Sequence, residues 1–339
     1  MSYSFTVGSF NLYKFSYRSD DTIRKDISRI AAIINENFDV VALQEVFSAG
    51  AMNLLLKELG GNWEGKWASP RPSVDANKDS LVKPMSAQAA EGYAFLWKKR
   101  RFELFTRQEV YGTRTVEPDI YTAYKVDEEN RLLRDPLWIR LVPKRGPFCE
   151  IRLFNTHIRF SKDGSSEDDT EGETILDNDI KSSTESMSAS EARKQELDVL
   201  IKRILQYNMG GDAGNRQVYC FLLGDYNLNI KNNINAGPYL PEVVEIKDGA
   251  IIQHFVTVQD EKTTLKQEKN IDETTVDRYA NNYDHFTYNK TRLVDNLGIR
   301  IESFRVDTLG QEWCNGQDVA KHRKEVSDHV PVGMNVTIG

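Results

Sequence analysis

The 339-residue chain has little cysteine and no long hydrophobic run. Its three cysteines include no C-x-x-C pair, which excludes a disulfide framework and favours a reducing compartment. Cys149 and Cys220 lie beside or within apolar, strand-like segments, so we expect small buried side chains there. No stretch approaches about 18 consecutive apolar residues, and residues 3–7 alternate too early to leave room for a signal peptide. We therefore expect a cytoplasmic protein without a membrane span.

The chain also lacks an excess of positive charge, since its formal net charge is −7. Residues 161–190 hold nine acidic residues and two lysines, and so account for the whole net charge. This serine-rich segment has no consistent periodicity, which predicts a mobile acidic insertion. The remainder is balanced in charge, so the composition does not exclude a local basic groove for nucleic acid.

No internal repeat and no break in composition divides the sequence. Its hydrophobic content of 40% is enough to form a sizeable core. The length alone would allow two domains, but strand-like segments at both ends favour one. We predict a single domain over residues 1–339.

Periodicity predicts both helices and strands. Isoleucines at helical spacing predict a helix over residues 20–36, followed by a buried strand over 38–43. A second helix is predicted over 49–59, stopped by Gly60-Gly61, and a long loop over 62–90. A third helix follows a capping box at Ser188-x-x-Glu191 and closes at Gly210-Gly211. Further strands are predicted over 93–97, 102–106, 137–142, 151–155, 218–223 and 330–338.

Polar side chains recur where the predicted apolar strands end. They are Asn11, Glu45, His157, Asp225 with Asn227, and the pair Asp328-His329. A single aspartate or histidine at a strand end is usually a turn former or a satisfied core residue. Together, however, these residues supply the carboxylates, amides and imidazoles that suit a hard divalent cation and phosphate chemistry.

With this pattern, the sequence resembles the endonuclease/exonuclease/phosphatase superfamily, which has the deoxyribonuclease-I-like fold, over nearly its full length. The motifs occur in the family's order: Ser9-Phe10-Asn11, Leu43-Gln44-Glu45-Val46, Asn155-Thr156-His157, Leu223-Gly224-Asp225-Tyr226-Asn227 and Ser327-Asp328-His329-Val330-Pro331-Val332. Two further segments are similar to those of deoxyribonuclease I: residues 91–96 around Glu91, and Tyr283-Asp284-His285. Leu133-Arg134-Asp135-Pro136 resembles the R-x-P stretch that precedes a strand in the family.

The resemblance implies a role for each motif residue. Glu45 would bind Mg²⁺, or Mn²⁺ as the alternative ion, with Asn11 and Asp328 nearby. His329, oriented by Asp284, would accept a proton from the attacking water. His157, backed by Glu91, would protonate or neutralise the leaving oxygen. Asp225 and Asn227 would position the water and the phosphorus, and Arg134 would contact a phosphate or support the site.

The sequence departs from deoxyribonuclease I at two positions. His285 follows Asp284 at a position where deoxyribonuclease I usually has an arginine. Phe47 follows Gln44-Glu45-Val46 where deoxyribonuclease I has the arginine of its Q-E-V-R motif. One phosphate contact is therefore expected to be missing or supplied elsewhere. The remaining histidines, His254, His285 and His322, match no catalytic position of the family and are interpreted as incidental.

We therefore expect an α/β fold, a four-layer sandwich of two packed mixed sheets with helices outside. The expected function is a Mg²⁺-dependent phosphodiesterase, an endonuclease with DNA as its nucleic-acid substrate. A phosphoinositide phosphatase or sphingomyelinase-like enzyme is the alternative, although no W-C-D-R segment of inositol polyphosphate phosphatases is present. From another class, a catalytically inactive binding protein of the same fold also fits, because fold does not determine function.

The acidic insertion gives a first prediction. Replacing residues 161–190 with a short Gly/Ser linker should leave the melting temperature nearly unchanged, because a solvated segment without periodicity contributes little burial. Differential scanning calorimetry of the two proteins measures this. A large drop in melting temperature would show that the segment is packed.

Overall fold

The structure is a computed structural model. It describes residues 2–16, 25–69, 91–121, 132, 134–158, 189–210, 215–230, 239–240, 243–247, 250–267, 278–309 and 319–339. Nearly all of the predicted acidic insertion, residues 161–190, and Ser188 of the predicted capping box lie outside these ranges.

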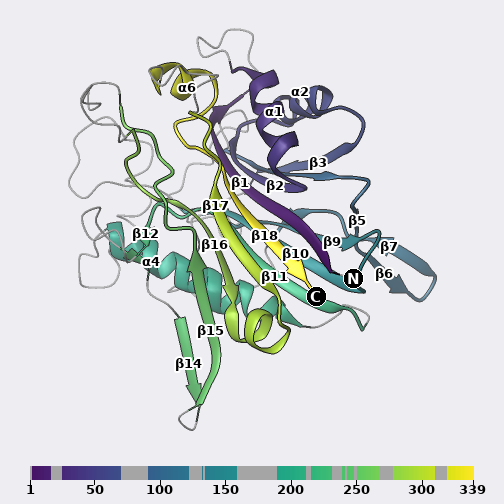
Figure 1. Ribbon diagram of the computed structural model, residues 1–339. Helices are drawn as coiled ribbons and strands as arrows, with labels where there is room; N and C mark the ends of the chain where they lie inside the picture. The colour runs from purple at the N-terminus through teal and green to yellow at the C-terminus, as the bar shows by residue number, and fades with distance from the viewer. Residues whose placement is uncertain are drawn as a thin grey trace, which may run out of the picture.

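Two large mixed sheets form the centre of the molecule (Figure 1). The first sheet contains, in spatial order, β17 (Arg300–Arg305), β18 (Val332–Ile338), β1 (Tyr3–Phe15), β2 (Val40–Val46), β4 (Tyr93–Lys98) and β3 (Trp63–Ala68). The second contains β14 (Val243–Lys247), β15 (Ala250–Val258), β16 (Asp284–Asn289), β11 (Gln217–Asp225), β10 (Cys149–His157), β9 (Leu137–Pro143) and β5 (Phe102–Leu104), with β8 (Asp119–Ile120) also on β9. Strands β1 and β2 pair in parallel, as do β10 and β11.

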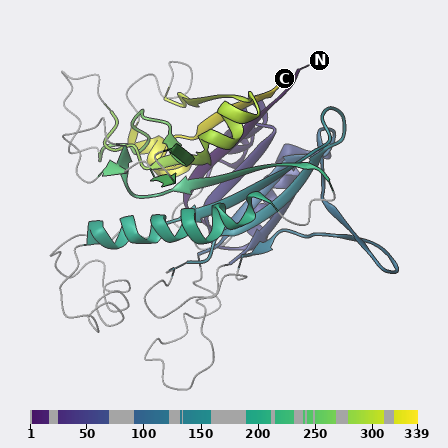
Figure 2. The ribbon, with the colours of Figure 1, turned by 90° about the horizontal axis from the view of Figure 1, so that it is seen from below.

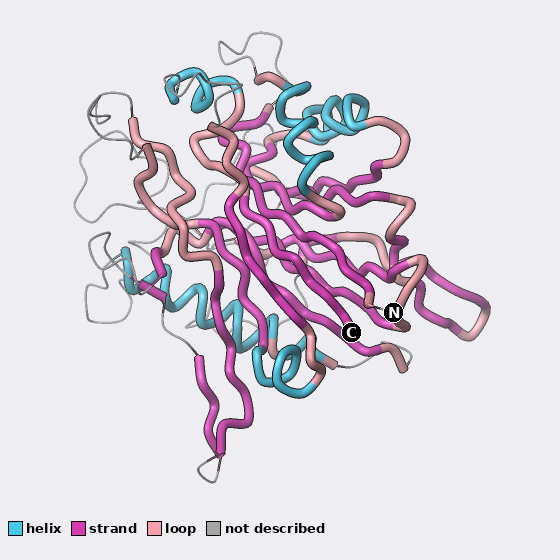
Figure 3. Tube along the Cα trace, viewed as in Figure 1, coloured by secondary structure: helices cyan, strands magenta, loops and turns pink. Residues whose placement is uncertain are grey.

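Helices cover the outer faces of the two sheets (Figure 3). Helices α1 (Ile27–Asn37) and α2 (Ala49–Leu59) share an apolar cluster with the first sheet. Helix α4 (Ala189–Val199) continues into the π-helix η1 (Leu200–Leu205) and the 3₁₀ turn η2 (Tyr207–Met209), and η1 packs on the second sheet. The predicted four-layer α/β sandwich is confirmed. The remaining short elements are η5 (Thr291–Asn296), α6 (Val319–Glu325), the pair β12 (Asn229–Ile230) and β13 (Tyr239–Leu240), and the hairpin of β6 (Thr106–Glu109) and β7 (Gly112–Thr115).

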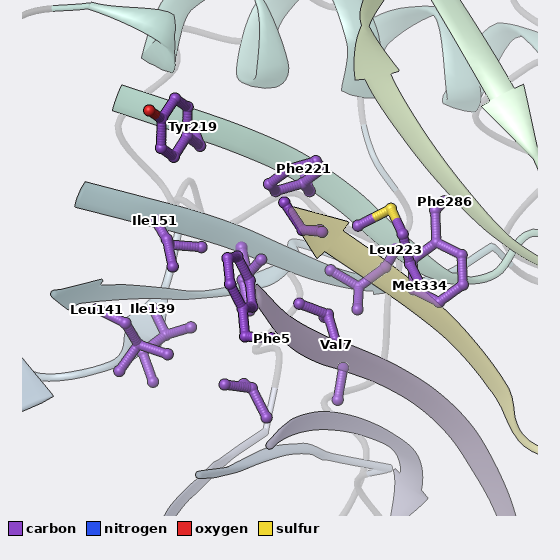
Figure 4. Close-up of a cluster of buried hydrophobic side chains, with 14 of the residues drawn as sticks. Phe5, Val7, Ile139, Leu141, Ile151, Tyr219, Phe221, Leu223, Phe286 and Met334 are labelled. Carbon is purple, nitrogen blue, oxygen red and sulfur yellow. The ribbon is translucent and has the colours of Figure 1, made fainter. Parts of the chain in front are cut away.

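The main core lies between the two sheets (Figure 4). Phe5, Val7 and Met334 of the first sheet face Ile151 and Phe221 of the second, and all five side chains are buried. Alternate residues of each strand point to this core, as the period of two requires. Cys149 and Cys220 are free and buried, as the sequence predicted.

The first helix begins later than its predicted range of 20–36. The side chain of Asp26 caps it by accepting the backbone N–H of Arg29 at 2.9 Å, and the helix starts at Ile27. Aspartate is a strong N-cap. The Asp20-Asp21-Thr22 signal used for the prediction lies outside the described residues.

The predicted loop over 62–90 is wrong at its start, because β3 occupies Trp63–Ala68. Trp63 and Trp67 alternate with exposed polar residues, and every residue of β3 pairs with β4. The proline, serine and lysine content of the following residues concealed this edge strand. The predicted strand over 102–106 is likewise divided between β5 and β6, with Phe105 between them.

None of the helices in the described part of the chain is long and apolar enough to cross a membrane.

Gly224 gives a prediction for stability. Its φ of +146° is rarely adopted by other residues, and a Cβ there would lie 1.8 Å from the carbonyl oxygen of Thr156 on the neighbouring strand. Gly224→Ala should therefore lower the free energy of unfolding by about 3 kcal/mol or more. Gly61→Ala is the matched control, since a Cβ at Gly61 meets nothing within 4 Å. Urea denaturation of both variants tests this, and equal stabilities would contradict it.

Candidate active site

The predicted site residues meet at one edge of the sandwich, where strands of both sheets begin or end. His157 and Asp225 are the last residues of β10 and β11 and pair with each other. Asp284, the first residue of β16, pairs with Asp225 from the other side. From the first sheet, Asn11 of β1 pairs with Gln44 of β2, next to Glu45. The motifs are thus brought together by strand pairing in each sheet and by the packing of the two sheets.

Asp225 lies at the centre of the site. Its Oδ2 is 3.6 Å from Nε2 of His157 and 3.6 Å from Nε2 of His329. The same oxygen accepts a hydrogen bond from the side-chain amide of Asn11 at 3.0 Å, and Oδ1 accepts the backbone N–H of Asn227 at 2.9 Å. Both imidazoles therefore present Nε2 to one carboxylate, with no tight hydrogen bond between them and it.

Each of these histidines has a second carboxylate on its other ring nitrogen. Nδ1 of His157 lies 2.5 Å from Oε1 of Glu91, and Nδ1 of His329 lies 2.7 Å from Oδ2 of Asp284. Such carboxylates fix the tautomer and the ring orientation and raise the basicity of the imidazole. The two predicted partnerships are therefore present in the geometry.

The carboxylates determine the charge of the buried imidazoles. Burial alone would lower the pKa of His157, but Glu91 and Asp225 outweigh it and raise the pKa to about 8. For His329, Asp284 and Asp225 likewise overcome burial and raise the pKa well above 6.5. Burial raises the pKa of Asp225, partly offset by the two histidines. The cluster thus holds protons at neutral pH that isolated side chains would release.

Oxygen donors that suit a divalent cation lie beside this cluster. Asn11 Nδ2 donates to Glu45 Oε1 at 3.1 Å, and Glu45 Oε2 accepts the backbone N–H of Lys14 at 2.9 Å. Oδ1 of Asp328 is buried and has no hydrogen-bond partner among the described residues. The other oxygen, Oδ2, lies 3.5 Å from Nη2 of Arg323, so Oδ1 is the oxygen left to bind a further cation. Oxygen ligands in small number are what Mg²⁺ prefers. The residues therefore fit the metal that the sequence predicted.

A second set of close ligand atoms belongs to Asp225, Asp284 and His329. One atom of each lies within 4.8 Å of the others, and all three residues are buried. This arrangement can hold a cation as well. Because one close pair is the Nδ1–Oδ2 hydrogen bond of His329 and Asp284, we interpret these residues as proton-transfer groups.

Arg134 and Asn227 are held by protein groups. The guanidinium of Arg134 forms a two-pronged ion pair with Glu91, with both N–O distances 2.8 Å. The side-chain amide of Asn227 donates to the carbonyl of Ile158 at 2.7 Å. Arg134 thus supports the partner of His157, and its predicted contact with a substrate phosphate stays a prediction.

Several supporting contacts come from residues to which the sequence assigned no role. The side chain of Asn155 donates to the carbonyls of Leu43 and Ala94 and accepts from Gln44 at 2.7 Å, so it links both sheets. The hydroxyl of Ser327 donates to the carbonyl of Asn11 at 2.6 Å and accepts the backbone N–H of His329. Asn155 and Ser327 therefore hold in place the strands and turns that carry the catalytic candidates. Their presence in the family motifs was the only sequence signal for this role.

His285 was interpreted as incidental, but it is fully buried at the site. Its Nδ1 lies 3.0 Å from the carbonyl oxygen of Gln259 and its Nε2 lies 2.7 Å from that of Leu228. The imidazole thereby joins the turn that carries Asn227 to the end of β15. His285 stands where deoxyribonuclease I usually has an arginine, and it contacts backbone carbonyls of this protein. The spacing of residues in the sequence could not indicate these contacts.

Backbone strain is concentrated in the same region. Five of the six non-glycine residues with positive φ in the described ranges are at or next to the site: Tyr13, Lys14, Glu45, Asn227 and Gln259. Such conformations cost of order 1–3 kcal/mol each and persist only where the surroundings enforce them. The turn at Tyr13 and Lys14 directs their N–H groups at Asn11 and Glu45.

Lys25 adds an unpredicted cation near the oxygen donors. Burial lowers its pKa to about 8, while Asp328 and Glu45 act in the opposite direction. Its ammonium donates to the carbonyl of Val326 at 2.9 Å and lies 5.4 Å from the centre of the Tyr13 ring.

The Glu91–His157 pair predicts a pH dependence. Because the pKa of His157 is raised to about 8, the pair stabilises the fold fully below pH 6.5 and loses this contribution as pH rises through about 8. Glu91→Gln should therefore lower the pKa of His157 and destabilise the protein more at pH 6 than at pH 9. Imidazole titration by NMR and urea denaturation at both pH values measure this. An unchanged pKa of His157 would contradict the assignment.

Comparison with solved structures identifies relatives in fold. Over 98% of each chain, the structure of D. rerio TDP2 complexed with single strand DNA product is similar, with a TM-score of 0.53 and 13% identity. The endonuclease/exonuclease/phosphatase from Bacteroides vulgatus has a TM-score of 0.51 at 13% identity, covering 99% of this chain and 100% of its own. ANGEL2, a 2′,3′-cyclic phosphatase, has a TM-score of 0.51 at 16% identity over 99% and 95%.

No protein-family model matches the sequence. No curated protein matches it significantly. The structural likeness extends over nearly the whole chain, and it agrees with the order of the sequence motifs. The chain therefore has the deoxyribonuclease-I-like fold of the endonuclease/exonuclease/phosphatase superfamily.

Proposed function

We propose that the protein is a Mg²⁺-dependent phosphodiesterase that hydrolyses DNA as an endonuclease. The observation that carries the proposal is the arrangement around Asp225, where two imidazoles direct Nε2 at one carboxylate and each has its own carboxylate behind it. A phosphoryl group needs a base on one side and an acid on the other, and this pair of histidines offers both.

Glu45, with Asn11 and Asp328, would hold the metal ion. Mg²⁺, or Mn²⁺ in its place, supplies Lewis-acid neutralisation of the phosphoryl charge when bound. The buried, unpaired Oδ1 of Asp328 and the carboxylate of Glu45 supply the negative charge that such an ion requires.

The protein's own groups then move two protons. His329, in its neutral form, accepts a proton from the attacking water at Nε2, while Asp284 stabilises the imidazolium that forms. As the bond from phosphorus to the leaving oxygen breaks, His157 donates a proton from Nε2 to that oxygen. Asp225 and Asn227 position the water and the reacting phosphorus between the two rings. Arg134 holds Glu91 and so keeps His157 in place.

DNA is the proposed substrate because the Glu91 and Tyr283-Asp284 segments resemble those of deoxyribonuclease I. The TDP2 neighbour bound to single strand DNA product supports a nucleic acid. The alternative, a phosphoinositide phosphatase or sphingomyelinase-like enzyme, uses the same metal motifs, and ANGEL2 is an example of a phosphatase on this fold. An inactive binding protein of the same fold would keep the architecture without turnover.

Nicking of supercoiled plasmid tests the proposal. With Mg²⁺ the wild-type protein should produce open circles, and EDTA should abolish the reaction. His329→Ala should lower the rate on the order of 10²-fold or more, because the proton acceptor is removed. His254→Ala is the control, since His254 lies in β15, away from the cluster.

Other substrates separate the alternatives. Release of phosphate from an inositol polyphosphate, or of phosphocholine from sphingomyelin, with DNA and RNA left intact would replace the nuclease assignment by the alternative. No metal-dependent turnover of any of these phosphoesters would favour the inactive binding protein.

A further inference from the structure

Exposed cations gather at the end of the sandwich opposite the site. We call this the cationic end surface: Lys99, Arg100, Lys144 and Arg145, which are exposed, and Arg216, which is half-buried. The turns that carry it are adjacent, because the backbone N–H of Lys144 donates to the carbonyl of Arg101 at 2.9 Å. Arg216 joins them through Phe148, whose ring centre lies 3.9 Å from its guanidinium carbon.

Within the described part of the chain, none of these five cations forms an ion pair. The two neighbouring cations differ, because Lys98 and Arg101 both bind Asp39, at 3.4 and 2.9 Å. The surface therefore keeps its positive charge available to a partner.

The same strands carry the site at one end and this surface at the other. Strand β4 runs from Tyr93, next to Glu91, to Lys98; β10 runs from Cys149 to His157; and β11 runs from Gln217 to Asp225. At about 3.3 Å per residue, a nine-residue strand separates the two ends by roughly 30 Å.

An apolar tip accompanies the cations. The β6–β7 hairpin projects from the body of the molecule (Figure 2). Its turn consists of Val110 and Tyr111, whose exposed fractions are 90% and 101%. Phe148, on the cationic end surface itself, is 63% exposed. Large apolar side chains exposed in this way indicate a surface that meets another phase or partner.

We propose that this end of the protein docks on an anionic lipid bilayer. Lysine and arginine near an acidic lipid surface are attracted by its negative potential, and apolar side chains at a projecting tip enter the interfacial region. A DNA duplex, whose bases are stacked inside the helix, would use the cations but not the apolar tip. A short, stiff DNA duplex engaged at the catalytic edge also cannot reach the opposite end without strong bending.

Docked in this way, the catalytic edge faces away from the lipid. The substrate would then come from the aqueous phase, and lipid headgroups of the same bilayer would not reach the site. The docking proposal goes beyond the proposed function, and it can hold or fail whatever the phosphoester is.

Flotation with vesicles tests the docking. The protein should float with vesicles of phosphatidylcholine containing roughly one-fifth phosphatidylserine, not with phosphatidylcholine alone, and about 1 M NaCl should release it. Combined Lys99→Glu, Arg100→Glu, Lys144→Glu and Arg145→Glu substitutions should weaken binding about 100-fold or more. Val110→Ser with Tyr111→Ser should weaken it about tenfold with the charge unchanged.

Lys57→Glu with Lys324→Glu is the matched control, because these exposed lysines lie on α2 and α6, outside the surface. All variants should keep the wild-type melting temperature. Equal flotation of wild type and the fourfold variant, or equal loss in the control, would overturn the proposal. So would vesicle binding that does not depend on phosphatidylserine. Tighter binding of a short DNA duplex than of vesicles, lost in the fourfold variant, would instead identify a nucleic-acid surface.

Discussion

The site depends on how the two sheets lie against each other, because each of its main contacts joins one sheet to the other. Glu91, two residues before β4, contacts His157 of the second sheet, and Asp284 of the second sheet contacts His329 next to the first. Asn11 and Asp225 form the third such contact. A shift of one sheet relative to the other by a single residue would separate all three pairs at once.

Packing and hydrogen bonding at the edge of the core prevent that shift. Between the sheets, buried aromatic and aliphatic side chains interdigitate, and a close-packed interior resists sliding. At the edge that carries the site, Asn155 of β10 in the second sheet donates to the carbonyls of Leu43 and Ala94, which are paired residues of β2 and β4 in the first sheet. Its amide is fully buried, where an unpaired polar group is costly. The hydrogen bonds of Asn155 thus fix the alignment of the two sheets more sharply than the apolar core alone would.

The sequence predicted the layers and the motif residues because both follow local rules. Strand ends carry the polar groups, and amphipathic periodicity identified α1 and α2, although Asp26 rather than Asp20 begins the first helix. It could not predict β3, since an edge strand with one apolar face is stabilised by pairing with β4. The roles of His285 and Lys25 depend on carbonyl groups and carboxylates that are distant in sequence. Strand pairing that brings distant residues together therefore limits what spacing can predict.

Charge is also distributed along the strands, and this bears on how a polyanion would approach. The five cations of the cationic end surface have no acidic partners among the described residues, whereas the edge that carries the candidate site concentrates Glu45, Asp225, Asp284 and Asp328. An edge with this many carboxylates repels phosphate unless positive charge is added. Protonated His157 provides part of that charge, and Lys25 provides more. The remaining deficit is what a divalent cation at Glu45 and Asp328 would compensate, so metal binding and substrate binding should depend on each other at this site.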